Sequence, residues 1–373
     1  MSGVRVRLVL VMLLVLVLSS PGSAVGAPPS HARSHTRYIF TDLGTLPGGT
    51  DSRAFGINSR GEVVGNSFVA ANARAGGFPA YHAFLYSNGK MRDLGTLPGD
   101  YYSAAYGIND RGDVVGESFS LRGNSSAFLY RAGHMYDLGR LSGSGGAHAI
   151  NSRGQVTGYT ATGSSSFVQA FLWTPTGPKD ARGRIIALGT LPGAGDSAGT
   201  GINDRGQIAG YTNRPDYFGY HAFVWTPHGS HGSRGVWRDL GTLPGGTSTG
   251  AWAINDQGEV AGTGDTASGE LHGFLYSKGE MIDLGTLPGG TESDARGINN
   301  RGEVVGTAFT AEGHPRAFLY RDGKMVELND LLPASLRGVV SMQGAFDIND
   351  RGQIVGVAAV GDQGHAFLLT PVP

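Results

Sequence analysis

The chain contains no cysteine, and this absence excludes two features. No disulfide bond can form, so a fold of up to 373 residues must be held together by its own core. A lipobox, the cysteine-containing signal for bacterial lipid attachment, is also excluded. Stability and location must therefore be read from other features of the sequence.

Charge is scarce as well. Only 16 % of the residues are Asp, Glu, Lys or Arg, and the net charge is −1. This balance provides no positive surface for nucleic acid, so we expect no nucleic-acid partner. The sequence also lacks an HExxH motif, a phosphate-binding loop and a calcium loop. We therefore expect no metal and no cofactor, and we assign no catalytic residue.

Long apolar runs are limited to one, at residues 8–18, which is too short to span a bilayer comfortably. Arg5 and Arg7 precede it, and Gly22-Ser23-Ala24 follows it. This order predicts a signal peptide over residues 1–24 and a secreted, extracellular protein without a stable membrane anchor. A membrane anchor is the alternative, which the short run disfavours. Residues 25–37, rich in Pro, Ser, Ala and His, predict a disordered lead-in.

What the chain has in abundance is repetition. A phrase Ile-Asn-x-x-Gly, or a close variant, occurs seven times, 42 to 52 residues apart. Each copy follows a variant of Asp-Leu-Gly-Thr-Leu-Pro-Gly and precedes a variant of Ala-Phe-Leu-Tyr. The repeated asparagines are Asn58, Asn109, Asn151, Asn203, Asn255, Asn299 and Asn349, and the phenylalanines are Phe84, Phe128, Phe171, Phe223, Phe274, Phe318 and Phe367.

One repeat reads as four short strands. Residues 52–58, 62–68, 82–86 and 90–94 are rich in β-favouring or small residues, and Asn-x-x-Gly and Asn-Gly turns join two of the pairs. We expect the repeated phenylalanines in the core, and the glycine of Val-Val-Gly where adjacent sheets approach closely. Four strands in roughly 48 residues match a propeller blade, so the sequence predicts an all-β, seven-bladed β-propeller.

The ends of the repeat region predict how the ring closes. Residues 38–43 match a fourth strand, and residues 365–369 match a third strand. In the middle of the chain these two form one hairpin, so we expect the N- and C-terminal strands to pair and close the ring. The prediction is one domain, residues 38–373, that exists as a monomer.

The repeated phrases resemble the HAF repeat family of bacterial extracellular proteins, named for its His-Ala-Phe triplet. The resemblance covers residues 39–369, and the triplet is complete at His82, His221 and His365. His272 precedes a glycine, and the other repeats carry Ser126, Gln169 and Arg316 instead. The resemblance implies export and repetition, but no established activity and no catalytic residue.

Polar residues that recur in every repeat are expected to be structural, because one active site needs one copy of each group. This applies to the turn asparagines, to the aspartates before Leu-Gly and to the histidines. Six turns carry arginine, which we expect to be solvated; an anion-binding ring on one rim is the alternative. Those residues are Arg60, Arg111, Arg153, Arg205, Arg301 and Arg351.

Residues that break the repetition are the better candidates for function. The loops between second and third strands and the linkers between blades share one face, which we call the loop-rich face. Their exposed aromatics, with Arg and Asp, are typical of recognition surfaces; ordinary loop variation is the alternative. The ligand-binding candidates are Tyr81, Tyr101, Tyr102, Arg214, Tyr217, Phe218 and Tyr220.

These features favour a non-enzymatic extracellular binding or scaffold module that binds its ligand on the loop-rich face. The expected partner is an extracellular glycan, a cell-wall component or a protein. The alternative is a secreted hydrolase or lyase acting on a polysaccharide or small molecule at the central mouth. It would require carboxylates, or a histidine with a carboxylate, to converge there, and the residues to test are Asp51, Asp100, Asp196 and Asp294.

Overall fold

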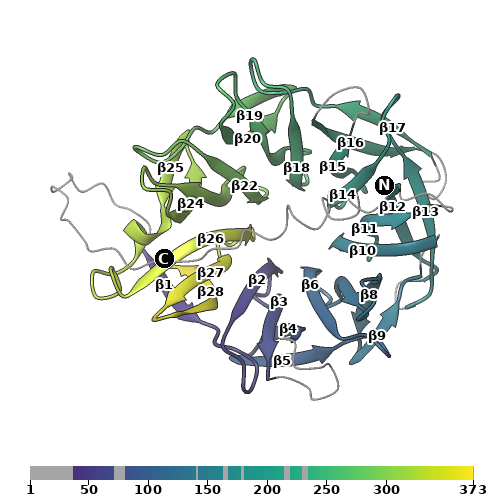
Figure 1. The fold of residues 1–373 in the computed structure, drawn as a ribbon, viewed down its shortest axis with the longest axis horizontal. Coiled ribbons are helices and arrows are strands. Elements are labelled where there is room, and N and C mark those ends of the chain that lie inside the picture. Colours follow the sequence, from purple (N-terminus) through teal and green to yellow (C-terminus); the bar gives the residue numbers. More distant parts are fainter. Residues whose placement is uncertain are drawn as a thin grey trace. The chain divides into compact units, whose positions relative to one another are not determined.

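The computed structural model describes residues 37–70, 80–139, 142–162, 167–177, 180–213, 219–228 and 234–372. They form strands β1 to β28 and one short 3-10 helix, η4 (Leu328–Leu331). The strands make seven four-stranded antiparallel sheets. Figure 1 shows these sheets as blades around one axis, which confirms the seven-bladed β-propeller. The expected signal peptide (1–24) and the lead-in up to residue 36 lie outside the described residues.

Each of the first six blades uses four consecutive strands, ordered from the axis outward. Blade 1 is β2 (Ser52–Ile57), β3 (Val63–Val69), β4 (Ala80–Ser87) and β5 (Lys90–Gly95). Blade 2 is β6 (Tyr102–Ile108), β7 (Val114–Phe119), β8 (Ser125–Arg131) and β9 (His134–Asp137). Blade 3 is β10 (Ser142–Ile150), β11 (Val156–Ala161), β12 (Val168–Pro175) and β13 (Gly183–Gly189).

The next three blades repeat the same order. Blade 4 is β14 (Ser197–Ile202), β15 (Ile208–Asn213), β16 (Tyr220–His228) and β17 (Arg234–Asp239). Blade 5 is β18 (Thr249–Ile254), β19 (Val260–Asp265), β20 (Leu271–Ser277) and β21 (Glu280–Asp283). Blade 6 is β22 (Ser293–Ile298), β23 (Val304–Phe309), β24 (Pro315–Arg321) and β25 (Lys324–Glu327).

Blade 7 contains both ends of the propeller. Its order from the axis outward is β26 (Val340–Ile348), β27 (Ile354–Val360), β28 (Gln363–Pro371) and β1 (Tyr38–Asp42). In Figure 1 the purple β1 lies beside the yellow β28, and their register runs from Tyr38 opposite Pro371 to Asp42 opposite Phe367. The predicted closure of the ring by the terminal strands is confirmed.

The Asn-x-x-Gly phrase forms the hairpin turn between the first and second strands of each blade. In blade 1 the Gly61 amide donates to the Asn58 carbonyl oxygen at 3.0 Å. Gly61 has a φ of +80°, a conformation that glycine adopts without steric cost. The turn therefore needs glycine at this position, as the sequence indicates.

The repeated phenylalanines are the centres of the packing between blades. All seven have 0 % of their surface exposed. Phe128 of blade 2 packs in one cluster with Ala83 and Leu85 of blade 1, so it joins two sheets. The prediction that these residues are core is confirmed.

The role expected for the Val-Val-Gly glycine was wrong. A Cβ atom on Gly116 would lie 2.0 Å from the carbonyl oxygen of Ala104, which belongs to the innermost strand of the same blade. Close approach between blades occurs at the innermost strands instead, where a Cβ on Gly56 would lie 2.7 Å from the Tyr106 carbonyl oxygen of blade 2. The twist and bulge of each innermost strand bring its backbone over the second strand, which explains the first contact.

Among the described residues, no helix is long and apolar enough to cross a membrane.

Candidate functional site

The repeated asparagines form a closed ring of hydrogen bonds around the axis. Asn58 Nδ2 donates to the Asn109 carbonyl oxygen at 3.1 Å, and the same bond links each blade to the next. The circle closes where Asn349 Nδ2 donates to the Asn58 carbonyl oxygen at 2.9 Å. The other five bonds join Asn109 to Asn151, Asn151 to Asn203, Asn203 to Asn255, Asn255 to Asn299, and Asn299 to Asn349.

Each asparagine also organises its own turn. Asn58 Oδ1 accepts from the backbone amides of Arg60 and Glu62, both at 3.0 Å. All seven asparagines are buried, and every one makes these bonds with its own turn. The structural role predicted for the turn asparagines is therefore confirmed. The sequence did not show that the same side chain also joins two blades.

The turn arginines make more hydrogen bonds and ion pairs than expected. The Arg60 guanidinium binds the Glu62 carboxylate and the Asp110 carbonyl oxygen of the next blade. Arg111 and Arg301 make the corresponding contacts in blades 2 and 6. Their exposed parts are solvated, but their donors are used to hold adjacent turns together. An anion-binding ring is therefore not available in these three blades.

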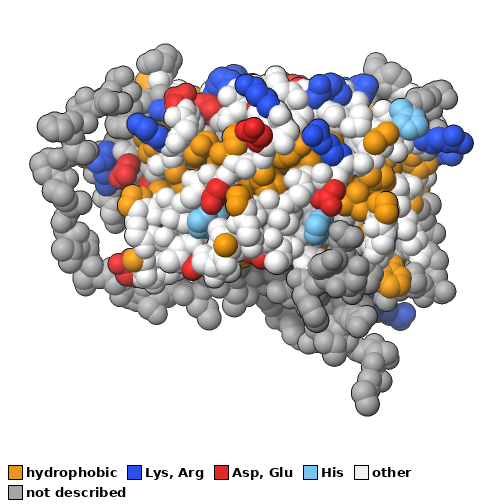
Figure 2. Space-filling view, turned by 90° about the horizontal axis from the view of Figure 1, so that it is seen from above, with side chains coloured by type: hydrophobic (Ala, Val, Ile, Leu, Met, Phe, Trp, Pro, Cys, Tyr) orange, Lys and Arg blue, Asp and Glu red, His pale blue; other side chains and the backbone are white. Residues whose placement is uncertain are grey.

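The repeated histidines pair with the repeated aspartates across the third and fourth strands. His82 Nδ1 lies 2.9 Å from Asp93 Oδ2, and the pairs His221–Asp239, His272–Asp283 and His365–Asp42 repeat this contact. The hydrogen bonds from His82 and from the Gly95 amide lower the pKa of Asp93 despite its partial burial. Figure 2 shows histidines beside acidic side chains on the outer wall.

Of the three blades without this histidine, blade 2 keeps the aspartate, as Asp137 with Ser126, and the other two change both residues. Blade 6 has Arg316 facing Glu327 at 3.3 Å, and blade 3 has Gln169 with Ala187. The position is thus a contact between the third and fourth strands of a blade, and where the pair is present it holds the outer strand. Among the described residues, no group of three or more His, Asp or Glu side chains could hold a metal ion.

The structure brings together only some of the sequence-predicted ligand-binding candidates. The rings of Tyr81 and Tyr102 meet with centroids 5.9 Å apart at the junction of blades 1 and 2. Tyr220 lies in blade 4, where its ring packs on Tyr211 at 5.4 Å. Tyr101 lies next to Tyr102 in the chain, and its amide donates to the Phe119 carbonyl oxygen. Arg214, Tyr217 and Phe218 lie outside the described residues.

Seven residues surround the axis that the sequence did not indicate as candidates. Each innermost strand has a bulge three residues before its repeated asparagine, where one residue is left out of the strand pairing. We call these seven side chains the axial collar. They are Phe55, Tyr106, His148, Thr200, Trp252, Arg296 and Phe346, and all are partly exposed.

Ring contacts connect the collar from blade to blade. Phe55 touches Phe346 of blade 7 and Tyr106 of blade 2, both at 5.6 Å between centroids. Tyr106 meets His148 of blade 3 at 5.7 Å. In the other half of the ring, the Trp252 ring meets the Arg296 guanidinium at 4.4 Å from its centroid, and it also contacts Tyr211, on the second strand of blade 4, at 5.8 Å. These contacts show that the bulge places the side chains next to one another around the axis.

One buried acid–base pair supports the collar between blades 2 and 3. His148 Nε2 lies 3.3 Å from Glu117 Oε1, and the Glu117 side chain is only 3 % exposed. His148 Nδ1 lies 3.0 Å from the Gly199 carbonyl oxygen, so this nitrogen carries a proton. Nε2 makes no hydrogen bond with any described residue, so the buried carboxylate lies close to the imidazole without a bond between the two.

A second charged group lies across the ring at blades 5 and 6. The Arg296 guanidinium stacks on Trp252 at 4.4 Å from the ring centroid, and its Nε is 2.5 Å from Asp294 Oδ2. Thr263 donates to the other oxygen of Asp294. Trp252 Nε1 donates to Thr263 at 3.0 Å. The hydrogen bond from Nε1 and the stacked guanidinium hold the indole in one orientation.

The four linker aspartates do not converge. Asp196 accepts from the Val168 amide and from Asn213 Nδ2, and Asp294 is bound by Arg296 and Thr263. Asp51 accepts from Thr50 Oγ1 and from the Gly364 amide. Among the described residues, no hydrogen bond joins any two of them, Asp100 included. The enzyme alternative also allowed a histidine close to a carboxylate near the axis. His148 and Glu117 meet that condition.

Asp347 replaces the glycine or alanine that follows the bulge in the other blades. Its Oδ2 accepts from the Ile57 amide at 3.0 Å, and burial raises the pKa of this carboxyl to about 7. The folded state therefore binds this proton more tightly than the unfolded state. Ionisation then destabilises the fold as pH rises from about 4 to 7, and the loss is complete above that range.

We predict that Asp347→Ala, which copies Ala149 and Ala253 of other blades, gains stability relative to wild type as pH increases. Between pH 5 and pH 8 the difference in unfolding free energy between the two proteins should change by on the order of 2 kcal/mol. Urea unfolding at both pH values measures it, and the histidines cancel in the comparison. A constant difference would show that Asp347 is ionised throughout this range.

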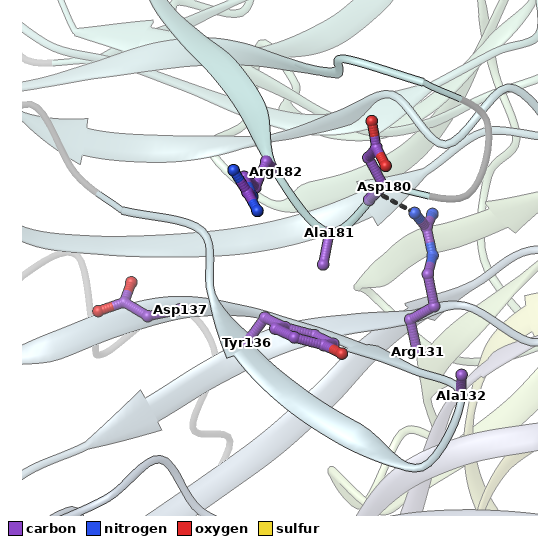
Figure 3. Close-up of a pocket in the computed structure, with 7 residues that line it drawn as sticks. All are labelled: Arg131, Ala132, Tyr136, Asp137, Asp180, Ala181 and Arg182. Carbon is purple, nitrogen blue, oxygen red and sulfur yellow. Dashed lines mark hydrogen bonds between the residues drawn. The ribbon is translucent and has the colours of Figure 1, made fainter.

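A pocket lies on the face opposite the loop-rich face, and none of its described lining residues indicates a ligand site. It measures about 400 Å³ between blades 2 and 3 and is lined by Arg131, Tyr136, Asp137, Asp180 and Arg182, among others. Figure 3 shows the Arg131 guanidinium turned toward the Asp180 backbone. Arg131 also binds the buried Asp113 carboxylate at 2.7 Å, which lowers the pKa of Asp113 despite its burial. This arginine is therefore a structural cation.

Comparison with known proteins identifies the fold but no activity. Residues 194–367 match a family described as "protein of unknown function (DUF3466)". No curated protein matches the chain. A puromycin hydrolase structure is similar at a TM-score of 0.55 with 14 % identity, over 85 % of this chain and 51 % of that one. A structure of YCF48 bound to D1 peptide is similar at a TM-score of 0.50 with 12 % identity, over 92 % of this chain and 99 % of that one.

A third similar structure is a Mycobacterium tuberculosis puromycin-hydrolyzing peptidase, at a TM-score of 0.49 and 13 % identity, over 83 % of this chain and 50 % of that one. The chain thus spans about half the length of the two puromycin-hydrolysing proteins. At these identities the similarity shows the propeller fold alone.

Proposed function

We propose that this chain is an exported, non-enzymatic binding or scaffold module whose ligand enters from the loop-rich face and binds at the axial collar. The signal-like N-terminus supports export, and the resemblance to the HAF repeat family supports an extracellular location. The ligand is an extracellular glycan, a cell-wall component or a protein. The observation that carries the proposal is the composition of the collar.

Equivalent positions of the seven blades can be compared with one another. Turn asparagines and core phenylalanines are the same in all seven blades, because each performs the same structural task. The collar position has the same backbone bulge in every blade, yet it holds phenylalanine, tyrosine, histidine, threonine, tryptophan and arginine. The fold does not dictate these side chains, so their variety fits selection for contact with a ligand.

The chemistry of the collar suits stacking combined with a few directed hydrogen bonds. Aromatic side chains offer large apolar surface, and the hydroxyl of Tyr106 and the indole of Trp252 add polar edges. The charged groups nearby are already paired, as Glu117 with His148 and Asp294 with Arg296. Fixed aromatic groups with satisfied charges favour binding, because they recognise shape at a low entropic cost.

We predict that Trp252→Ala weakens ligand binding at least tenfold, about 1.4 kcal/mol, because truncating a central aromatic removes both stacking area and the support of Arg296. The measurement is a glycan and cell-wall binding screen on residues 38–373, followed by titration of any hit. Tyr136→Ala is the matched control, since Tyr136 is an exposed aromatic on the outermost strand of blade 2.

Melting curves of both variants separate a binding loss from misfolding. Equal binding by wild type and Trp252→Ala, with both proteins folded, would remove the collar as the ligand site. A loss with Tyr136→Ala alone would move the site to the outer wall.

A second candidate function, a hydrolase or lyase, is favoured by one observation. Glu117 and His148 form the acid–base pair that such a reaction requires, close to the axis. The exchange Glu117→Gln tests it, because this variant keeps the side-chain shape and removes the acid. Loss of a hydrolytic activity in Glu117→Gln, with ligand affinity intact, would replace the binding proposal.

A further inference from the structure

Arg53 differs from every other residue at its position in the repeat. The position lies five residues before the repeated asparagine, on the innermost strand, and the other blades place Ala104, Gly146, Ala198, Gly250, Asp294 and Gly344 there. Arg296, the other arginine near the axis, is paired with Asp294 and stacked on Trp252. Arg53 is partly buried and has no hydrogen bond or ion pair with any described residue. A partly desolvated guanidinium without a counter-ion is costly unless something else pairs with it.

The residue beside Arg53 also has an unused polar atom. Arg53 and Asn66 are directly opposite in the register of β2 and β3, so their side chains leave the same face of blade 1. Asn66 is 6 % exposed, and its Nδ2 donates to the Tyr102 hydroxyl at 2.7 Å. Its Oδ1 has no hydrogen-bond partner among the described residues.

Aromatic rings enclose this corner of blades 1 and 2. Tyr102 contacts Tyr81 at 5.9 Å and Phe119 at 5.2 Å, and Tyr81 contacts Phe68 at 5.7 Å. Burial raises the pKa of Tyr102 to about 12 and also raises the pKa of Tyr81, so both phenols keep their protons. Because the Tyr102 oxygen accepts from Asn66, its own proton is available to an acceptor.

The neighbouring carboxylates are directed elsewhere. The field of Asp51 reaches Tyr81, but this side chain is bound by Thr50 and by the Gly364 amide of blade 7. The field of Glu117 reaches Tyr102, but Glu117 is paired with His148 of blade 3. Among the described residues, neither acid forms an ion pair with Arg53.

We propose that Arg53, Asn66, Tyr81 and Tyr102 form a subsite for the carboxylate of an acidic sugar, a uronic acid. The guanidinium binds the carboxylate oxygens, the Tyr102 hydroxyl donates to one of them, and the buried Asn66 side chain positions that hydroxyl through its 2.7 Å hydrogen bond. This subsite rests on the proposed binding function and extends it, since it names a charged ligand group that the collar itself does not require.

The aromatic rings around this subsite favour a sugar over the C-terminus of a peptide as the ligand. A pyranose ring has an apolar face of C–H groups that packs against tyrosine and phenylalanine rings, and it carries hydroxyl donors next to its carboxylate. A peptide C-terminus would supply the carboxylate and one N–H, but no ring face for Tyr81 and Phe119. Acidic peptides are therefore the comparison in the test.

The test is calorimetric titration of residues 38–373 with tetragalacturonic acid, with its methyl ester, and with a peptide that has a free C-terminal carboxylate. We expect the acid to bind and the ester to bind at least tenfold more weakly. Arg53→Gln should lose at least tenfold in affinity for the acid and little for the ester, and Arg53→Lys should recover part of the loss. Binding of the acid should also weaken as salt increases.

Arg122→Gln is the matched control, because Arg122 is an exposed arginine in the loop between β7 and β8, on the same face, and its loss changes the net charge equally. It should bind tetragalacturonate as wild type does. Arg53→Gln is expected to fold, since five other blades carry alanine or glycine at this position.

Three results would overturn the subsite. These are equal affinity of wild type and Arg53→Gln for the acid, equal affinity of wild type for acid and ester, and Arg53-dependent binding of the peptide but not of the acid. The proposed function has a separate outcome: Trp252-dependent binding of a neutral glycan, unaffected by Arg53→Gln, keeps the collar and removes the subsite.

Discussion

Deleting residues 363–371 should leave a protein without a cooperative unfolding transition. The deletion removes β28, which pairs with β27 on one side and with β1 on the other. It also removes Phe367, which is fully buried among residues of blades 6 and 7. Loss of one large core aromatic alone typically costs ~3–5 kcal/mol, against a total stability of ~5–15 kcal/mol for a domain. The open blade would in addition expose two strand edges.

Thermal and urea unfolding followed by circular dichroism measure this effect. A soluble deletion protein with an unchanged melting curve would contradict the closure that the register of β1 and β28 describes. The matched control is a circular permutant in which an Asn-Gly turn joins Pro371 to Tyr38 and the chain is opened between Asn88 and Gly89. It keeps every strand pair and transfers the split hairpin to blade 1, so we expect it to unfold cooperatively at a similar temperature.

Asn203→Ala should lower the unfolding free energy by roughly 2–4 kcal/mol. Asn203 is 4 % exposed and makes four hydrogen bonds: its Nδ2 reaches the Asn255 carbonyl and Gln207 Oε1, both at 2.9 Å, and its Oδ1 accepts from the Arg205 and Gln207 amides. Alanine leaves buried groups in two blades without partners, which costs more than the bonds themselves contribute.

Denaturant titration of wild type and variant measures this loss. Asn203→Asp keeps the acceptor for the turn and removes the donors to the next blade, so its deficit reports the link between blades. Asn124→Ala, at an exposed position in a loop of blade 2, is the matched control and should change stability by less than about 0.5 kcal/mol. A similarly small change for Asn203→Ala would mean that the asparagine ring adds nothing to stability.

Much of the architecture could be predicted from the sequence because the same pattern recurs in every repeat. The spacing of the asparagines indicated seven blades, and the match of residues 38–43 and 365–369 to two halves of one hairpin indicated how they close. The repeated phenylalanines are core since their period is that of a buried strand position. These features depend on local pattern and on simple pairing, which the order of residues expresses directly.

The candidate site could not be predicted in the same way. The alternation of side chains along a strand is broken by the bulge, so the spacing that places Ala54 against its neighbours does not show where Phe55 points. Three of the seven ligand-binding candidates do meet other aromatics, but in two separate places: Tyr81 and Tyr102 at the junction of blades 1 and 2, and Tyr220 within blade 4. Loop composition alone does not specify such distances.

The sequence by itself determined the number of blades, the closing hairpin, the turns and the core, because each depends on residues a few positions apart or on copies of one pattern. Only the tertiary structure decided which side chains meet around the axis. The pairing of Glu117 with His148, the ring of asparagine bonds and the position of Arg53 beside Asn66 and Tyr102 all join strands whose arrangement follows from seven bulges and seven blade contacts. Those contacts join neighbouring strands and blades, whose spacing the pattern of a single repeat does not specify.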